Sequence, residues 1–176
     1  GTSMGAVIGS LYVMGYTPDE MHDLIASDKF RKWYMGEPDV SYQFYFKQPQ
    51  PSPSMIDITI DRKDSLLLII PNSTSLINPQ QMNLGFIDIF SSATAACKND
   101  FDSLLVPFRC VASDVFNKRK LVLDNGDLGD AVRASLSFPF VFKPIRIDSI
   151  LAYDGGIYDN YPYDVMIEDF NPDFII

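Results

Sequence analysis

The chain opens on the pentapeptide Gly1-Thr2-Ser3-Met4-Gly5, which has the form G-x-S-x-G. This pattern is typical of a nucleophile elbow, a sharp turn between a strand and a helix that presents a serine hydroxyl. The backbone of such a turn is crowded, so the residues two before and two after the serine must be small. Gly1 and Gly5 meet that demand. Since glycine and serine are common in other tight turns, the pattern alone does not establish catalysis.

The apolar segment 6–14 follows the elbow directly and indicates a helix. We expect this helix to run from about Met4 to Val13 and to be stopped by Gly15. Its N-terminal N–H groups and its dipole would point toward the oxygen of Ser3, where they stabilise developing negative charge.

A serine hydroxyl needs a group that takes its proton, and the usual group is an imidazole. The single histidine of the chain, His22, lies in a segment that reads as a second short helix. Thr17 is a good N-cap there, Pro18 fits the first turn, and Glu20 completes a capping box. We interpret His22 as an exposed helix residue. No histidine follows any candidate acid, so a Ser-His-Asp mechanism is not available within this span.

A carboxylate near the other end of the sequence is the remaining candidate base. The apolar run 150–153 reads as a strand that ends in Asp154, and Gly155 and Gly156 follow it. Two glycines let the backbone turn sharply and leave open space beside the carboxylate. An ordinary Asp-Gly turn between strands is the alternative interpretation.

Three ordered motifs together resemble the patatin-like phospholipase family: segment 1–6, the segment 132–139 (VRASLSFP), and Asp154-Gly155-Gly156. Segments 107–114 and 160–162 are also similar to that family. The resemblance covers residues 1–35 and 79–176. It implies a three-layer α/β/α fold with helices on both faces of the sheet, and a Ser-Asp dyad that works without histidine.

By this resemblance Ser3 is the nucleophile and Asp154 accepts and returns its proton. Ser3 would attack an ester carbonyl and release the alcohol or lysolipid, and water would then hydrolyse the acyl-enzyme with Asp154 again as base. The substrate would be the acyl ester of a lipid or another fatty acyl compound. A thioesterase or acyltransferase on the same dyad, and a non-catalytic interaction module, remain open as alternatives.

The chain departs from the family pattern at its start. Patatin-like proteins carry a glycine-rich loop before the elbow that supplies most of the oxyanion hole, and this sequence begins at the first elbow glycine. The backbone N–H of Met4 could supply one donor. Segment 173–176 reads as part of a buried strand. We therefore expect one catalytic domain over 1–176 that is incomplete at both ends, and an inactive isolated fragment.

Composition excludes several classes of protein. The 176 residues are 47% hydrophobic and 21% charged, as in a globular domain, and the longest apolar run, 66–70, is too short to span a membrane. A net charge of −9 argues against nucleic acid and against electrostatic attraction to anionic membranes. A lipid substrate or a membrane surface would be contacted through apolar side chains. The compartment stays open between the cytoplasm and a bacterial cell envelope.

No pattern indicates a metal or cofactor site. Cys97 and Cys110 lie in apolar contexts without a nearby histidine, so we expect buried free thiols. The acidic residues Asp57, Asp61 and Asp64 do not have the spacing of a calcium loop, and we interpret them as solvated.

Coarsely, helices and strands alternate as in an α/β layered fold. Residues 29–34 predict a third short helix, 79–97 a longer one, 107–113 and 120–123 strands, and 127–136 a helix. We interpret Arg133 and Ser135 on that last helix as structural, with Phe138 and Phe140 after it as candidates for a pocket wall. Residues 40–77 predict a three-stranded antiparallel insertion, which could be surface padding, a partner-binding flap or a lid.

Overall fold

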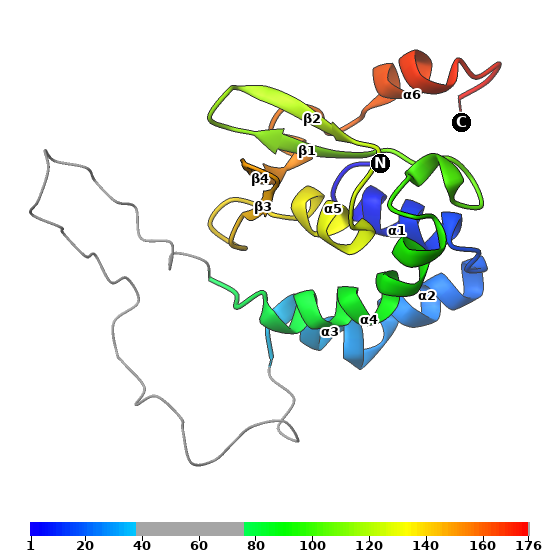
Figure 1. Cartoon of the computed structure of the whole chain (residues 1–176). Coiled ribbons are helices and arrows are strands. Elements are labelled where there is room, and N and C mark those ends of the chain that lie inside the picture. The colour runs from blue at the N-terminus through cyan, green and yellow to red at the C-terminus, as the bar shows by residue number, and fades with distance from the viewer. Residues whose placement is uncertain (38–75, 176) are drawn as a thin grey trace, which may run out of the picture.

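The computed structural model describes residues 1–37 and 76–175 (Figure 1). Nearly all of the β insertion expected at 40–77 lies outside these residues, as do Asp57, Asp61 and Asp64. Those expectations stay predictions.

The described strands form one four-stranded sheet. The strands are β1 (Cys110–Asp114), β2 (Arg119–Leu123), β3 (Ile145–Ile147) and β4 (Ile150–Asp154), in the order β2-β1-β4-β3. Every pairing between them is antiparallel. Strand β1 is buried along its whole length, because neighbours on both edges and a helix beneath it cover this central strand.

The helices lie in successive layers on one side of the sheet, and α5 contacts the strands directly (Figure 1). Helix α5 (Leu128–Ser135) contacts β1, β3 and β4, and α1 (Met4–Val13) packs beside α5. Helix α4 (Gln80–Ala96) covers α5 from the side away from the sheet, and α3 (Asp28–Met35) packs on α4. The α/β class is confirmed. The three-layer arrangement with helices on both faces stays a prediction.

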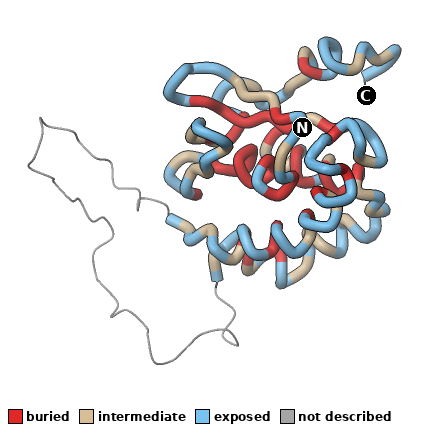
Figure 2. The backbone as a smooth tube through the Cα atoms, in the orientation of Figure 1, coloured by how far each residue is buried: buried red, intermediate tan, exposed pale blue. Residues whose placement is uncertain are grey.

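The core lies between the sheet and α4, around α1 and α5, and buried residues gather there and along β1 in Figure 2. Its largest fully buried side chains are Phe90, Phe101, Leu11, Met82 and Leu128. At the α3–α4 contact, a Cβ on Gly85 would lie 2.4 Å from the Trp33 ring, so the indole requires glycine there. Contacts of α5 with α1, β1 and β4 hold these elements together near the candidate site.

The predicted helix ends agree well with the structure where capping signals exist. Helix α1 spans the predicted range, and Gly15 follows it with φ of 92°. Helix α2 (Pro18–Ala26) has the predicted capping box between Thr17 and Glu20. Helix α4 occupies almost all of 79–97, whereas the strand predicted at 107–113 begins only at Cys110.

The C-terminal part differs from the sequence prediction. Residues 173–175 form no strand, and Phe174 is 87% exposed, so the expected buried strand is wrong for these residues. No described strand pairs with them, and apolar composition alone cannot bury a segment that lacks a neighbour. Helix α6 (Tyr163–Phe170), which the sequence analysis missed, precedes them.

Ion pairs attach α6 and the segment before it to the sheet region. Lys120 contacts Asp159 and Asp164, and Arg109 contacts Asp169 at 2.7 Å. Val165 is the buried residue of the helix, so polar contacts carry much of its attachment.

Candidate active site

Ser3 lies at the turn between the first residues and α1. Its φ and ψ are 52° and −124°, a conformation that side-chain-bearing residues rarely adopt. The N–H of Gly5 donates to the carbonyl oxygen of Thr2 at 2.8 Å and closes the turn. A backbone held in such a region costs on the order of 1–3 kcal/mol and persists where surrounding contacts enforce it.

The two elbow glycines have different roles. A Cβ on Gly1 would lie 2.5 Å from the carbonyl oxygen of Gly5, so the expected crowding is present at that position. At Gly5, no described atom outside its own helix lies within 4 Å of the equivalent point. Among the described residues, the steric argument for a small residue is therefore wrong at Gly5.

Strand β1 brings the elbow and the end of β4 together. Thr2 forms a parallel bridge with Val111, and the carbonyl oxygen of Gly1 accepts from the Val111 N–H at 2.9 Å. The final residue of β4, Asp154, pairs with Ala112, the next residue of β1. Because both segments pair with adjacent positions of one strand, Ser3 and Asp154 emerge side by side.

The Ser3 hydroxyl donates a hydrogen bond to Oδ2 of Asp154 at 2.8 Å. The other carboxylate oxygen, Oδ1, accepts from the Gly156 N–H at 2.7 Å. Asp154 is 3% exposed. The carboxylate is thus fixed by one backbone donor and presents its second oxygen to the serine.

Glycines after Asp154 make this approach possible. A Cβ on Gly155 would lie 2.3 Å from the carbonyl oxygen of Val111, closer than real Cβ atoms come. A Cβ on Gly156 would lie 3.0 Å from Oδ1 of Asp154 and from the Asn160 side chain. Gly155 therefore lets the 3₁₀ helix 155–157 pack against β1, and Gly156 lets its own N–H approach the carboxylate.

The end of α5 contacts both members of this pair. The Ser135 hydroxyl accepts from the Ser3 N–H at 2.8 Å and donates to the Val111 carbonyl oxygen at 2.6 Å. The carbonyl oxygen of Ser137 accepts from the Asp154 N–H at 2.9 Å.

Arg133 holds the turn that contains Ser137, directly after α5. Its guanidinium donates to the Ser137 hydroxyl at 2.7 Å, to Asn83 at 3.0 Å and to the carbonyl oxygen of Lys143 at 3.0 Å. Burial lowers the pKa of Arg133 to about 10. These contacts join α5 to α4 and to the segment before β3, and they agree with the interpretation of Arg133 as a structural residue.

The sequence analysis named the Met4 N–H as a candidate oxyanion donor, and this role stays a prediction. The N–H groups of Gly5, Ala6 and Val7 donate to the carbonyl oxygens of Thr2 and Ser3. Within residues 1–37 and 76–175, no acceptor binds the Met4 N–H. It is the first amide of α1, at the positive end of the helix dipole.

His22 lies on α2 with its side chain 78% exposed, and its Nδ1 is 3.5 Å from Asp23. It takes no part in the contacts of Ser3. The interpretation of His22 as a surface helix residue agrees with the structure.

Comparison with known proteins confirms the family resemblance. The family model for patatin-like phospholipase matches residues 1–167. The chain belongs to the patatin-like phospholipase family. This match runs through the elbow, the α5 segment and the Asp154 turn.

Curated relatives of this patatin-like chain are similar over different lengths. A patatin-like phospholipase domain-containing protein of Caenorhabditis elegans is 24% identical over 94% of this chain and 10% of its own length. An uncharacterized NTE family protein of Mycobacterium tuberculosis is 36% identical over 35% of this chain and 17% of its own length. A second from that organism is 34% identical over 35% of this chain and 11% of its own length. The chain thus spans less than a fifth of these relatives.

The cysteines of this patatin-like chain are free and buried, as expected. Burial raises the pKa of the Cys110 thiol to about 11. Its Sγ lies 3.3 Å from the carbonyl oxygen of Ala131 on α5, so this first residue of β1 directs a small buried group toward α5.

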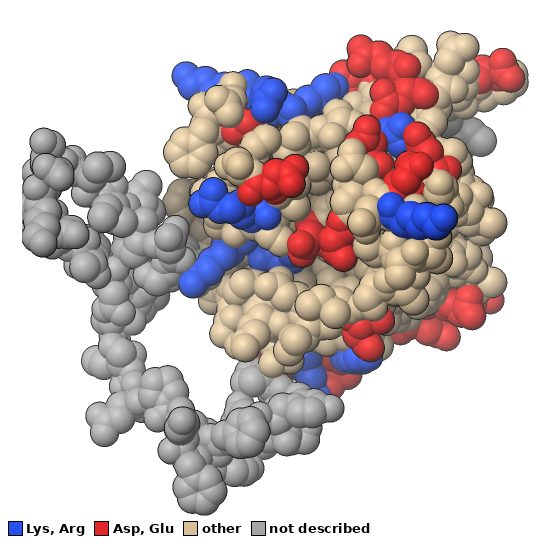
Figure 3. Space-filling model, viewed as in Figure 1, with Lys and Arg blue, Asp and Glu red and all other residues tan. Residues whose placement is uncertain are grey.

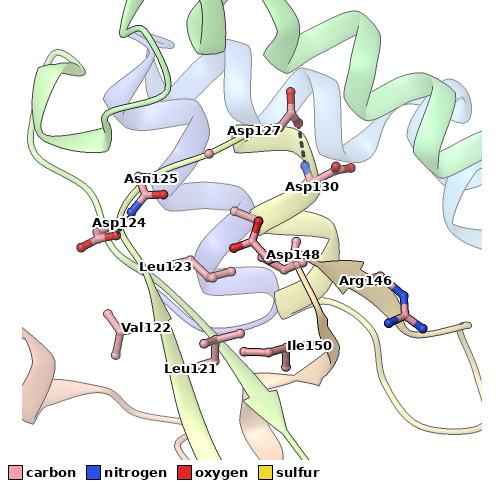
Figure 4. Close-up of a pocket in the computed structure, with 13 residues that line it drawn as sticks. Leu121, Val122, Leu123, Asp124, Asn125, Asp127, Asp130, Arg146, Asp148 and Ile150 are labelled. Carbon is pink, nitrogen blue, oxygen red and sulfur yellow. Dashed lines mark hydrogen bonds between the residues drawn. The ribbon is translucent and has the colours of Figure 1, made fainter.

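Two described pockets lie away from Ser3 and Asp154. One, of about 300 Å³, lies between β2, α5 and β3 and is shown in Figure 4. Its lining includes Arg146 and the carboxylates Asp124, Asp127, Asp130 and Asp148. Burial, with the nearby charge of Asp127, raises the pKa of Asp130. In the part of the chain that the structure describes, no cluster of His, Cys, Asp and Glu has the form of a metal site.

The second pocket, of about 470 Å³, lies between α3 and α4 beside Trp33 and Leu84. Phe138 and Phe140, considered as pocket walls from the sequence, line neither pocket and are exposed. Ile157 and Tyr158, directly after the Asp154 turn, are exposed apolar side chains as well.

Charged side chains are unevenly distributed on the face of the molecule drawn in Figure 3. Acidic side chains gather over the α6 region in Figure 3, and the residues there include Asp159, Asp164, Glu168 and Asp169. No helix in the described ranges is both long and apolar enough to cross a bilayer.

Proposed function

We propose that the protein carrying this chain is a serine acyl hydrolase that cleaves acyl esters of lipids, with Ser3 as nucleophile and Asp154 as proton acceptor. The observation that carries this proposal is the 2.8 Å hydrogen bond from the Ser3 hydroxyl to Oδ2 of Asp154, made at a strained elbow. Membership in the patatin-like phospholipase family supports lipid hydrolysis as the reaction class.

The first half-reaction forms an ester on Ser3. As the Ser3 oxygen attacks the substrate carbonyl carbon, its proton passes to Oδ2 of Asp154 and the carbonyl oxygen becomes an oxyanion. Collapse of the tetrahedral intermediate breaks the bond to the leaving alcohol, which takes the proton from Asp154. The acyl group remains on Ser3.

The second half-reaction returns the enzyme to its starting state. A water molecule loses a proton to Asp154 and attacks the acyl carbonyl carbon. The intermediate then releases the fatty acid, and the proton on Asp154 returns to the Ser3 oxygen. The Gly156 N–H holds Oδ1 in place, so Oδ2 remains directed at the reacting oxygen throughout.

The Met4 N–H would bind the oxyanion together with donors from the glycine-rich loop that the family resemblance implies. Each missing oxyanion donor costs on the order of 10²–10³ in rate. The measurements use the full-length protein that carries this chain.

We further propose that residues 1–176 belong to one catalytic domain of the three-layer α/β/α type. The family match supports a single domain because it continues through residues 38–75 from one described part to the other. Helix α5 contacts elements of both parts, including α1 and β4.

Contact with a lipid surface would rest on apolar side chains. The net charge of −9 opposes attraction to anionic headgroups. Phe138, Ile157 and Tyr158 are exposed and lie close in sequence to Ser137 or Asp154. We expect binding to neutral lipid surfaces that depends little on salt.

The test measures hydrolysis of a p-nitrophenyl acyl ester series by the full-length protein, with labelling of Ser3 by a fluorophosphonate. Ser3→Ala and Asp154→Asn should abolish hydrolysis while the protein stays folded. Ser10→Ala and Asp114→Asn are matched controls, because these buried residues bond other partners. They should retain activity.

Activity in Asp154→Asn, or an inert wild type that fluorophosphonate does not label, would refute the dyad. An inert result would favour the interaction module. Transfer of the acyl group to an alcohol or from a thioester, faster than ester hydrolysis, would indicate the acyltransferase or thioesterase alternative.

A further inference from the structure

The C-terminal turn of α5 joins the two residues of the proposed dyad through neighbouring groups. The Ser135 side chain bonds the backbone N–H of Ser3, and the Ser137 backbone carbonyl bonds the backbone N–H of Asp154. Ser135 and Ser137, here named the α5 clamp, are both fully buried. One rigid turn therefore contacts both partners of the 2.8 Å hydrogen bond.

The Ser135 hydroxyl both accepts and donates a hydrogen bond. It accepts from Ser3 at 2.8 Å and donates to the Val111 carbonyl oxygen at 2.6 Å. A hydroxyl has one donor and two acceptor sites, so this one group can link the elbow to β1. No apolar side chain of similar size could make either bond.

The bond to the Ser3 N–H acts where the backbone is strained. Ser3 has φ of 52°, and the hydroxyl on its Cβ must point at Asp154. Rotation of the Ser3 peptide toward an ordinary conformation would turn that Cβ and move the hydroxyl. A hydrogen-bond acceptor fixed on the Ser3 N–H opposes this rotation.

The clamp itself is anchored. The Ser137 hydroxyl accepts from the Arg133 guanidinium at 2.7 Å and donates to the Arg133 carbonyl oxygen at 2.9 Å. Arg133 also bonds Asn83 on α4 and the carbonyl oxygen of Lys143. The turn is thus held to the helical layer on one side and to the dyad on the other.

We propose that Ser135 is a positioning residue for acylation of Ser3: its hydroxyl holds the strained Ser3 peptide so that the serine oxygen stays aligned with Asp154. This inference rests on the proposed function. Ser135 acts through Ser3 and does not itself contact the reacting atoms.

The competing account is that Ser135 is structural only. The Val111 N–H already bonds Gly1, and Thr2 already bridges β1, so the elbow has other backbone anchors. If these suffice, loss of the Ser135 hydroxyl would lower stability without a separate effect on catalysis.

The experiment compares Ser135→Ala with Ser10→Ala in the full-length protein. Ser10 is an equally buried helix serine whose hydroxyl donates to the Val7 carbonyl oxygen at 2.8 Å, and among the described residues this hydroxyl makes no hydrogen bond to the elbow. Both variants lose a buried hydroxyl and its bond to a carbonyl oxygen. Only Ser135→Ala removes the acceptor of the Ser3 N–H.

We expect Ser135→Ala to lower kcat by about 10- to 100-fold, because a displacement near 1 Å at reacting atoms has effects of that size. KM should change by less than about threefold, and the rate of fluorophosphonate labelling should fall in parallel with kcat. Hydrogen exchange at the Ser3 amide should accelerate. Ser10→Ala should keep the wild-type kcat at temperatures well below its unfolding midpoint.

Equal kcat values in Ser135→Ala and Ser10→Ala would overturn the proposal. So would a fall in kcat that is fully explained by the lower unfolding midpoint of Ser135→Ala. If Ser135→Ala does not fold, Ser135→Cys decides, because a thiol is nearly the same shape and a weaker acceptor. We expect an intermediate kcat there, and a wild-type value would refute the role. An active wild type separates failure of this inference from failure of the proposed function, whereas an inert wild type overturns both.

Discussion

The substitution Gly155→Ala tests the packing that brings Asp154 to Ser3. The added Cβ would lie 2.3 Å from the Val111 carbonyl oxygen, 2.8 Å from its carbonyl carbon and 2.9 Å from Cγ2 of Thr2. Two of these three atoms belong to the backbone of the central strand β1, which cannot rotate away as a side chain can. The segment after Asp154 must therefore move.

The size of the movement follows from the contact distance. Ordinary carbon–oxygen contacts begin at about 3.4 Å, so relief requires a shift of roughly 1 Å between the 3₁₀ helix 155–157 and β1. Asp154 precedes Gly155 directly, and its Oδ1 is bonded to Gly156, so the carboxylate moves with this segment. We expect kcat to fall by about 10²-fold and unfolding to become easier by about 1–3 kcal/mol.

The measurements are kcat on a p-nitrophenyl ester and the urea dependence of unfolding, both with the full-length protein. Gly5→Ala is the matched control, because it adds the same methyl group to the other side of the dyad where no described neighbour lies within 4 Å. Its stability should equal or exceed wild type by up to about 1 kcal/mol. Wild-type kcat and stability in Gly155→Ala would refute the argument from this contact.

Two further predictions concern the elbow and the buried thiol. Ser3→Gly should be more stable than Ser3→Ala by about 1–3 kcal/mol in urea unfolding, because both lack the hydroxyl and only alanine keeps the strained φ of 52°; equal stabilities would show that the elbow carries no strain. Burial raises the pKa of Cys110 from 9.0 to about 11, so the folded state holds this proton more tightly than the unfolded state. Its contribution to stability is present below pH 9 and is lost as the pH rises toward about 11. The free energy of unfolding should fall more steeply over that range in wild type than in Cys110→Ala, and identical slopes would contradict the assignment.

Local signals in the sequence were sufficient for the first helices. The Thr17 and Glu20 capping box and the apolar segment after Ser3 depend on groups a few residues apart, so their geometry follows from the local sequence. The exposure of His22 followed from its position in that short amphipathic helix. Motif resemblance also selected Ser3 and Asp154, which the structure joins by a hydrogen bond, and their catalytic roles stay predictions.

Long-range contacts were not predictable from the residues alone. The buried strand expected at 173–176 depended on an apolar pattern, and residues 173–175 have no strand neighbour. The small-residue requirement expected at Gly5 depended on the elbow pattern, and among the described residues no atom outside its own helix lies within 4 Å of a Cβ at Gly5. Ser135 carried no signal beyond its place in a motif, because its hydrogen bond with the Ser3 N–H joins residues 132 positions apart in the chain.

The sequence by itself determined the chemical groups available, namely one serine at an elbow, one carboxylate before two glycines, and a histidine in an exposed helix. Tertiary structure decided which of these groups meet. Thr2 and Asp154 pair with adjacent residues of β1, Val111 and Ala112, and the end of α5 bonds the backbone on both sides of the resulting hydrogen bond. Strand pairing and buried hydrogen bonds between distant segments form only when the whole core assembles, so no local pattern specifies them.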